Sequence, residues 1–296
     1  WQTGLAFQTE PVGGFGQSVS SVNANGNQSR NNGSGDIGWQ GIGRISGRPW
    51  MIDETKFWHF GVSAGHTTVN NQYRADGTFS QANATAGQNS GGMSFVGFLG
   101  TNVDRTNVLN TGNLTSGSND SPDARRIDSY DRYGAETALV YGPFSAQAEY
   151  LRTNINGLNY SGEHLTGYYG YLSYFLTGES RAYHVRNGAW NRIVPNKSFH
   201  WNGTGLGAWE FAVGYDYLNM NNGKIRGGEA DMIRFALNWY PHTHVRVMTN
   251  VNHVLNLNTA GVVNYNAAGE PIANDRSQGF HDANITSFLT RVQVDF

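Results

Sequence analysis

The chain has 296 residues, a formal net charge of -2, no cysteine and a charged fraction of only 14%. Soluble globular domains carry charge on about a quarter of their residues, and the near-neutral balance offers no basic field for nucleic acid. No run of about 18 apolar residues is present, so the sequence offers no transmembrane helix. A transmembrane β-barrel fits these values, because only one face of each strand has to be apolar.

About ten segments alternate between apolar and polar residues, which is the period of a strand with two unlike faces. In one of the clearest, Trp209, Phe211 and Val213 share a face, while Glu210 and Asp216 lie on the other. Each segment has roughly the 9–11 residues that a tilted membrane strand needs. In chain order the expected strands are residues 1–8, 37–48, 57–68, 130–141, 144–154, 165–176, 207–218, 232–240, 244–254 and 286–296.

The connections between these segments differ in length. Residues 141–144 (YGPF) and 239–244 (WYPHTH) are tight turns, and residues 48–56 are moderately short. The long connections, rich in Asn, Gly and Ser, are residues 10–35, 69–128 and 255–283. Outer-membrane barrels have short periplasmic turns and long extracellular loops. If the last strand ends in the periplasm, counting back along the chain places the short turns on the periplasmic side and the long loops on the extracellular side. Residues 177–206 are the exception, because this long connection falls on the periplasmic side.

Aromatic residues gather near the ends of these strands, as they do in the belts where membrane proteins meet the lipid–water interface. They include Trp58, Tyr141, Phe144, Trp209 and Trp239. A soluble sandwich or solenoid also alternates. Here, however, aromatics and Gly dominate the apolar face, and no repeat of fixed period appears. We therefore expect an all-β fold, an antiparallel transmembrane β-barrel, with residues 1–296 as a single domain.

Several stretches resemble the phosphate-selective porin O and P family of Gram-negative outer membranes. They are RYGAETALVYGPFSAQAEY (132–150), GYYGYLSYFLTGESRAY (167–183), GAWEFAVGYDYLNMNNGKIRGGEAD (207–231) and LNWYPHTHVRVMTNVNHV (237–254), with the terminal Phe296. The earlier part fits loosely, through residues 36–50 and 110–114.

The resemblance implies a sixteen-stranded homotrimeric porin whose lumen is lined by arginine and draws in anions. About six strands would then precede Trp1, and this chain would carry about the C-terminal ten. The inward-folding loop, which usually follows an early strand in such porins, would be missing. A closed barrel of about ten strands stays open as the alternative, because an even strand count still permits closure.

Charged residues on the polar face are the candidates for function, because fixed charges in a channel bias which ions enter. Guanidinium suits phosphate, since it stays charged and its fork gives paired hydrogen bonds. The candidate pore-lining and anion-binding residues are Arg44, Arg234, Arg246 and Arg291. The expected lumen carboxylates are Glu136, Glu149, Glu210 and Asp216. Arginines that pair with these carboxylates would brace the wall instead, so an anion track and a wall network both remain open.

Two other basic groups need separate interpretations. Arg125, Arg126, Lys224 and Arg226 are expected in extracellular loops, where they would be solvated charge, recruit anions or bind lipopolysaccharide phosphates. The second group lies on the long turn-side connection and consists of Arg181, Arg186, Arg192 and Lys197. We hypothesise that this connection folds into the periplasmic vestibule and that its charges pass anions inward.

The favoured function is passive diffusion of small hydrophilic solutes through the outer membrane, with an anion preference like that for phosphate. The alternatives are a general, weakly selective porin, a barrel enzyme or an adhesin. No Gly-flanked Ser or His–Asp cluster supports an enzyme, and no cofactor is expected. The pair His242 and His244 is interpreted as a turn and not as a metal site. Expected partners are outer-membrane lipid, lipopolysaccharide, inorganic anions as solutes and two further copies of the chain in a homotrimer, with no nucleic acid.

Overall fold

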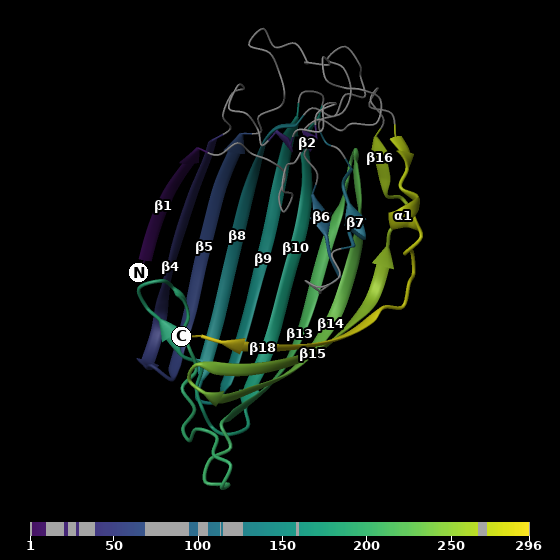
Figure 1. The fold of residues 1–296 in the computed structure, drawn as a ribbon. Helices are drawn as coiled ribbons and strands as arrows, with labels where there is room; N and C mark the ends of the chain where they lie inside the picture. The colour runs from purple at the N-terminus through teal and green to yellow at the C-terminus, as the bar shows by residue number, and fades with distance from the viewer. Residues whose placement is uncertain are drawn as a thin grey trace.

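The computed structural model describes residues 2–9, 21–22, 28–29, 39–68, 95–99, 106–112, 114, 127–157, 160–265 and 271–295. Within them, ten strands form one antiparallel sheet in which each strand pairs with its neighbours in the chain. They are β1 (Gln2–Thr9), β4 (Trp39–Asp53), β5 (Lys56–Thr68), β8 (Ile127–Tyr141), β9 (Phe144–Gly157), β10 (Tyr160–Phe175), β13 (Ala208–Asn222), β14 (Ile225–His242), β15 (Val245–Asn258) and β18 (Thr286–Val294). Figure 1 shows a strongly curved sheet, with β14, β15 and β18 sweeping across its lower end.

Short elements lie outside this sheet. They include the strand pairs β2 (Ser21–Val22) with β3 (Gln28–Ser29) and β16 (Val263–Tyr265) with β17 (Pro271–Ala273), and the helix α1 (Asp275–Gln278), and two further strand pairs are described below. In the part of the chain that the structure describes, no helix has the length and apolar character to cross a membrane.

The expected strands are confirmed, but most are longer than expected. The connection predicted at residues 48–56 is wrong, because β4 continues to Asp53 and turns at Glu54–Thr55. Irregularities in register between Gly47 and Trp50, and between Met51 and Asp53, accompany this extension. Proline cannot donate to the ladder, so a bulge allows the strand to continue past Pro49. β14 likewise runs through a proline to His242, with a register shift beside it.

The outer face of the sheet is a broad apolar surface. A row of directly paired residues, one from each strand, crosses this face from β5 to β18. This row is Trp58, Leu139, Ala146, Leu172, Val213, Phe235, Val251 and Phe288. Most of its large side chains are exposed, Phe288 to 71%. Such an apolar exterior is the surface that lipid covers in a transmembrane barrel.

At the loop end, the inner face carries a hydrophobic core of its own. The strand pair β6 (Val96–Gly97) and β7 (Leu109–Asn110) lies over β13 and β14 on this face (Figure 1). Leu109 and Leu114 are fully buried in a cluster with Met220, Leu257 and other inward residues. Gly228, at φ 90°, allows the close approach, because a Cβ there would meet Leu109 at 2.8 Å. Part of the long connection after β5 therefore packs inward, while the expectation that the inward-folding loop after an early strand is missing stays a prediction.

At the turn end, part of the stretch of residues 176–207 folds onto the same face, and we call the whole stretch the inner segment. It contains the short hairpin of β11 (Tyr183–His184) and β12 (Ala189–Trp190). The chain then returns to the rim, where Ile193 is buried against Phe175 and Ala208. The long turn-side connection that sequence analysis found exceptional is thus ordered against the strands, and it builds much of the site described next.

Candidate functional site in the lumen

Glu136 on β8 is the centre of a charged group on the inner face. Its Oε1 accepts a hydrogen bond from Arg44 Nε of β4 at 2.9 Å, and Arg44 Nη2 also contacts it. The ring Nε2 of His59 on β5 lies 3.0 Å from the same oxygen. The alternation of the three strands brings these side chains together, since each faces inward near one level of the sheet. Arg44 is therefore already neutralised by a carboxylate.

The same group fastens the inner segment to the wall. Arg44 Nη2 donates to the carbonyl oxygen of Gly188 at 3.0 Å, and the Tyr183 hydroxyl lies 2.8 Å from His59 Nδ1. Burial raises the pKa of the Tyr183 hydroxyl, although the nearby Arg48 and Arg44 oppose this rise. The hydroxyl therefore keeps its proton for the bond to His59. Arg44 of β4 thus holds the turn of the hairpin, and His59 of β5 holds its first strand.

A second anchor centres on Gln147 of β9. Its Oε1 accepts hydrogen bonds from Trp190 Nε1 and from the Tyr171 hydroxyl, both at 2.6 Å. Its Nε2 donates to the Tyr169 hydroxyl at 3.0 Å. Arg181 stacks on Trp190, with its guanidinium carbon 4.5 Å from the ring centroid. Gln147 thus joins the wall tyrosines of β10 to Trp190 of the inner segment.

A cavity of about 220 Å³ remains between the inner segment and the wall. Its lining includes Arg44, Glu136, Glu149, Tyr183 and Trp190. Glu149 contacts the Tyr169 hydroxyl, so its charge also faces this space. The cavity therefore carries one guanidinium against two carboxylates, together with aromatic rings and amide groups, and does not form a purely cationic site.

The remaining predicted lumen groups on β13 and β14 are also paired. Arg234 forms a two-point ion pair with Asp216, with nitrogen–oxygen distances of 2.5 and 2.6 Å. Glu210 is 2% exposed and accepts hydrogen bonds from the Tyr240 hydroxyl at 2.8 Å and from Asn238 Nδ2 at 3.0 Å. These contacts fit the wall-network interpretation, because Arg234 is ion-paired with Asp216 across the two strands and Glu210 is hydrogen-bonded to side chains of β14.

Arg246 and Arg291 differ from the first two arginines. Arg246 donates to the amide oxygen of Gln293 at 2.7 and 3.1 Å, and within the described residues neither arginine forms an ion pair with a carboxylate. Arg192 of the inner segment comes close to Asp295, at 4.0 Å. The hydrogen bond from Gln293 lowers the pKa of the Asp295 carboxyl, and Arg192 and Arg246 act in the same direction. Near the turn end of β15 and β18, Arg192 and Arg246 thus lie close to the carboxylate of Asp295, and Arg291 lies further along β18.

The other basic residues are scattered. Arg181 points into the lumen, whereas Arg186 and Lys197 are exposed. Lys224 lies in the two-residue turn between β13 and β14, and Arg226 lies at the start of β14, so neither is in a long loop. Arg125 and Arg126, like the terminal Phe296, lie outside the described residues. Among the described residues, no cluster of three or more His, Asp or Glu side chains could hold a metal ion.

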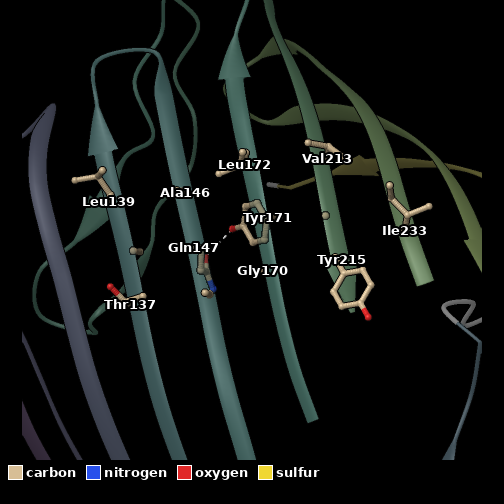
Figure 2. Close-up of a pocket in the computed structure, with 13 residues that line it drawn as sticks. Thr137, Leu139, Ala146, Gln147, Gly170, Tyr171, Leu172, Val213, Tyr215 and Ile233 are labelled. Atoms are coloured by element: carbon tan, nitrogen blue, oxygen red, sulfur yellow. Dashed lines mark hydrogen bonds between the residues drawn. The ribbon is translucent and has the colours of Figure 1, made fainter. Parts of the chain in front are cut away.

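A larger concavity, of about 430 Å³, lies on the outer face and takes no part in the lumen. Figure 2 shows Leu139, Leu172, Val213 and Ile233 around a floor of small residues that includes Ala146. Its lining is almost wholly apolar, and it lies among the apolar rows of the outer face. We therefore place the functional site on the inner face.

Sequence reasoning found the inward-facing charges but missed much of what they bind. His59, Tyr183 and Trp190 were not proposed as site residues. Their roles depend on where the inner segment comes to rest, and no local pattern specifies that. The available signal was indirect: a long connection on the turn side, rich in aromatic and basic residues, is unusual in a barrel whose turns are short.

Comparisons with known proteins agree with this architecture. The model of the family described as "Phosphate-selective porin O and P" matches residues 43–263. An uncharacterized protein of Caulobacter vibrioides is 32% identical over 164 residues, which is 55% of this chain and 30% of that protein. Porin O of Pseudomonas aeruginosa is 32% identical over 127 residues, which is 39% of this chain and 27% of that porin. The matched region spans less than a third of either relative.

Proposed function

Because the chain belongs to the phosphate-selective porin O and P family, we propose that it forms part of a passive diffusion channel for small hydrophilic solutes in the bacterial outer membrane. The observation that carries the proposal is the contrast between the two faces of one curved sheet. The outer face exposes apolar rows, while the inner face carries charged side chains and an ordered segment that narrows the space beside them. A channel needs this division between a lipid-facing wall and a wet lumen.

We further propose that the channel prefers anions, and that the preference comes from its turn end. Arg44 and Arg234 are each bound to a carboxylate, so their fields are largely cancelled and they act as wall braces. Arg192 and Arg246 lie near the carboxylate of Asp295, and Arg291 has no carboxylate partner among the described residues, so the described inward side of β15 and β18 carries a positive excess. An excess of fixed positive charge raises the local concentration of anions, including phosphate.

The character of the outer face also suggests which molecules surround the protein. Its apolar rows support contact with outer-membrane lipid, and they equally support contact with neighbouring copies of the chain in a homotrimer. Lipopolysaccharide would meet the polar outward residues at the loop end. We propose no catalytic activity, and the name of the matched family supports a channel and not an enzyme.

The proposal is tested by the reversal potential of the intact protein in a planar bilayer under a KCl gradient, repeated with added phosphate. We expect a potential set by chloride, and a chloride current that phosphate reduces. The double variant R246Q/R291Q should weaken the anion preference more than R44Q does, because only the first pair is free of a carboxylate partner. A weakly selective channel that ignores phosphate would leave the general porin as the function.

A further inference from the structure

Part of the inner segment leaves the lumen and projects below the turn end of the sheet. In this projection, residues 197–206, Trp201 is 95% exposed. Its neighbours Val194 and Leu206 are each 64% exposed. Such strong exposure of apolar side chains beside a structured rim is uncommon in water and marks a surface that contacts something else.

The projection is a preorganised hairpin. His200 and Gly205 form an antiparallel bridge, and Asn202 Oδ1 accepts hydrogen bonds from the backbone N–H and the hydroxyl of Thr204 at 3.2 and 2.7 Å. The backbone of Gly205 is pressed against that of Ser198, since a Cβ there would lie 1.9 Å from the Ser198 carbonyl oxygen. Trp201 is therefore presented on a defined turn, and the cost of ordering this turn is already met within the fold.

The aromatic side chains of the projection continue those of the outer face. Phe199 packs edge-on against Trp201 and against Trp239, with ring centroids 5.0 and 5.2 Å apart. Trp239 stacks on Trp209, its outward partner across β13 and β14. Both indole N–H groups donate to the carbonyl oxygen of Leu206, at 2.9 and 3.2 Å. The row of rings thus runs from the apolar wall to the tip of the hairpin.

We propose that residues 197–206 are a membrane anchor, and that Trp201 lies among the phospholipid headgroups of the inner leaflet. The inference rests on the proposed placement of the sheet in the outer membrane, with its turns on the periplasmic side. Tryptophan favours this interface because its ring is apolar while its N–H can still reach water and headgroups. Lys197 is exposed at the base of the hairpin, where its ammonium can reach lipid phosphates.

A lipid surface fits these features better than a protein partner does. The aromatic row is continuous with the wall that lipid covers, so the hairpin extends an existing interface and does not begin a separate one. One exposed indole with two aliphatic neighbours also offers far less area than the roughly 800 Å² per partner of a stable protein interface. The anchor would hold the later part of the inner segment at the rim of the sheet, while the hairpin of β11 and β12 stays in the lumen.

The absence of cysteine makes a labelling test direct. A single cysteine is introduced as H200C, which leaves Trp201 intact, and is labelled with an environment-sensitive fluorophore in the full chain. Two matched controls carry the same label: L237C on the lipid-facing wall, and V185C on the exposed part of the lumen hairpin. In proteoliposomes we measure quenching by phospholipids brominated near the headgroup and by aqueous acrylamide.

We expect the label at position 200 to be quenched by brominated lipid to an extent close to that at position 237, and to be largely shielded from acrylamide. The additional change W201A should shift this label towards the water-exposed behaviour of position 185. A label at 200 that behaves like that at 185 while 237 remains lipid-quenched would overturn the anchor alone. If the label at 237 also escapes lipid quenching and is quenched by acrylamide instead, the proposed membrane placement fails, and the anchor fails with it.

Discussion

Glu136 shows how a single residue connects the wall to the inner segment. One carboxylate oxygen is shared by Arg44 and His59, and these two in turn hold Gly188 and Tyr183. Hydrogen bonds to charged groups are about twice as strong as neutral ones, and losing one partner leaves the others unsatisfied. Glu136 therefore both cancels the charge of Arg44 and helps to fix where the hairpin rests.

Replacing Glu136 by glutamine separates these two roles. The substitution keeps an acceptor oxygen beside Arg44 but removes the negative charge, so the lumen gains positive potential. We expect E136Q to raise the anion-to-cation permeability ratio by roughly twofold, in line with one partly screened charge near the ion path. The reversal potential under a KCl gradient measures this ratio.

The matched control is D231N, which removes the same charge from the outer face. Asp231 accepts a hydrogen bond from the outward-facing Tyr215 hydroxyl at 2.7 Å and has no access to the lumen. Its substitution should leave the permeability ratio unchanged. An equal shift in both variants would show that the ratio follows overall charge and not the position of Glu136.

Among the elements, the hairpin of β11 and β12 is the part that narrows the lumen and can be removed cleanly. Its ends are already joined, because the Asn191 backbone N–H donates to the Ala182 carbonyl oxygen at 2.8 Å. Excising residues 183–190 and linking these two positions through a short glycine connection should therefore leave the strands in place. We expect single-channel conductance to rise by on the order of twofold, because the ion path widens.

Excision of residues 199–204 from the projecting hairpin serves as the control for this change. It shortens the same segment by a similar length but removes nothing from the lumen, so conductance should stay at the original value. A rise in both variants would mean that the inner segment is simply loosened. No change in either would mean that the hairpin does not limit the current.

The elements also show what a sequence can and cannot reveal. In β13, apolar residues such as Phe211 alternate with polar residues such as Glu210, because one face of the strand is apolar and the other is polar. The strands and the direction of their side chains could therefore be predicted from the sequence of each segment alone. The continuation of β4 past Pro49 could not, because the bulge that accommodates it depends on the register with β5. The partners of Arg44 depend on the distant hairpin, and the inward core around Leu109 depends on β13 to β15.

For the molecule as a whole, the boundary of the apolar band on the outer face reveals the tilt of the strands. At the loop end, the first ionisable outward residue is His66 on β5, directly after Ala64, and His253 on β15, directly after Val251. When the paired residues are followed strand by strand from Val251, however, they lead to Trp58 on β5, which is six residues before Ala64. The boundary therefore shifts by about one residue for each strand crossed, which a level membrane surface requires of tilted strands.

A shift of about one residue per strand, with a rise of roughly 3.3 Å and a strand spacing of about 4.8 Å, corresponds to a tilt of about 35°. This lies at the lower end of the range for outer-membrane barrels. Polarised infrared spectroscopy of the protein in aligned bilayers measures this angle through the amide dichroism. A tilt below about 20° would contradict the assignment of the apolar band to the membrane.

The hydrophobic cluster inside the loop end constrains the order in which the molecule can fold. Leu109 and Leu114 come from the long connection after β5, while Leu257 belongs to β15, far later in the chain. Their contacts cannot form until the intervening strands have paired, so the entropy of closing a long stretch of chain is lost before the burial of these leucines compensates for it. The part of this cluster that involves Leu257 can consequently be completed only after β15 has paired, so the completion of the cluster belongs to the last steps of folding.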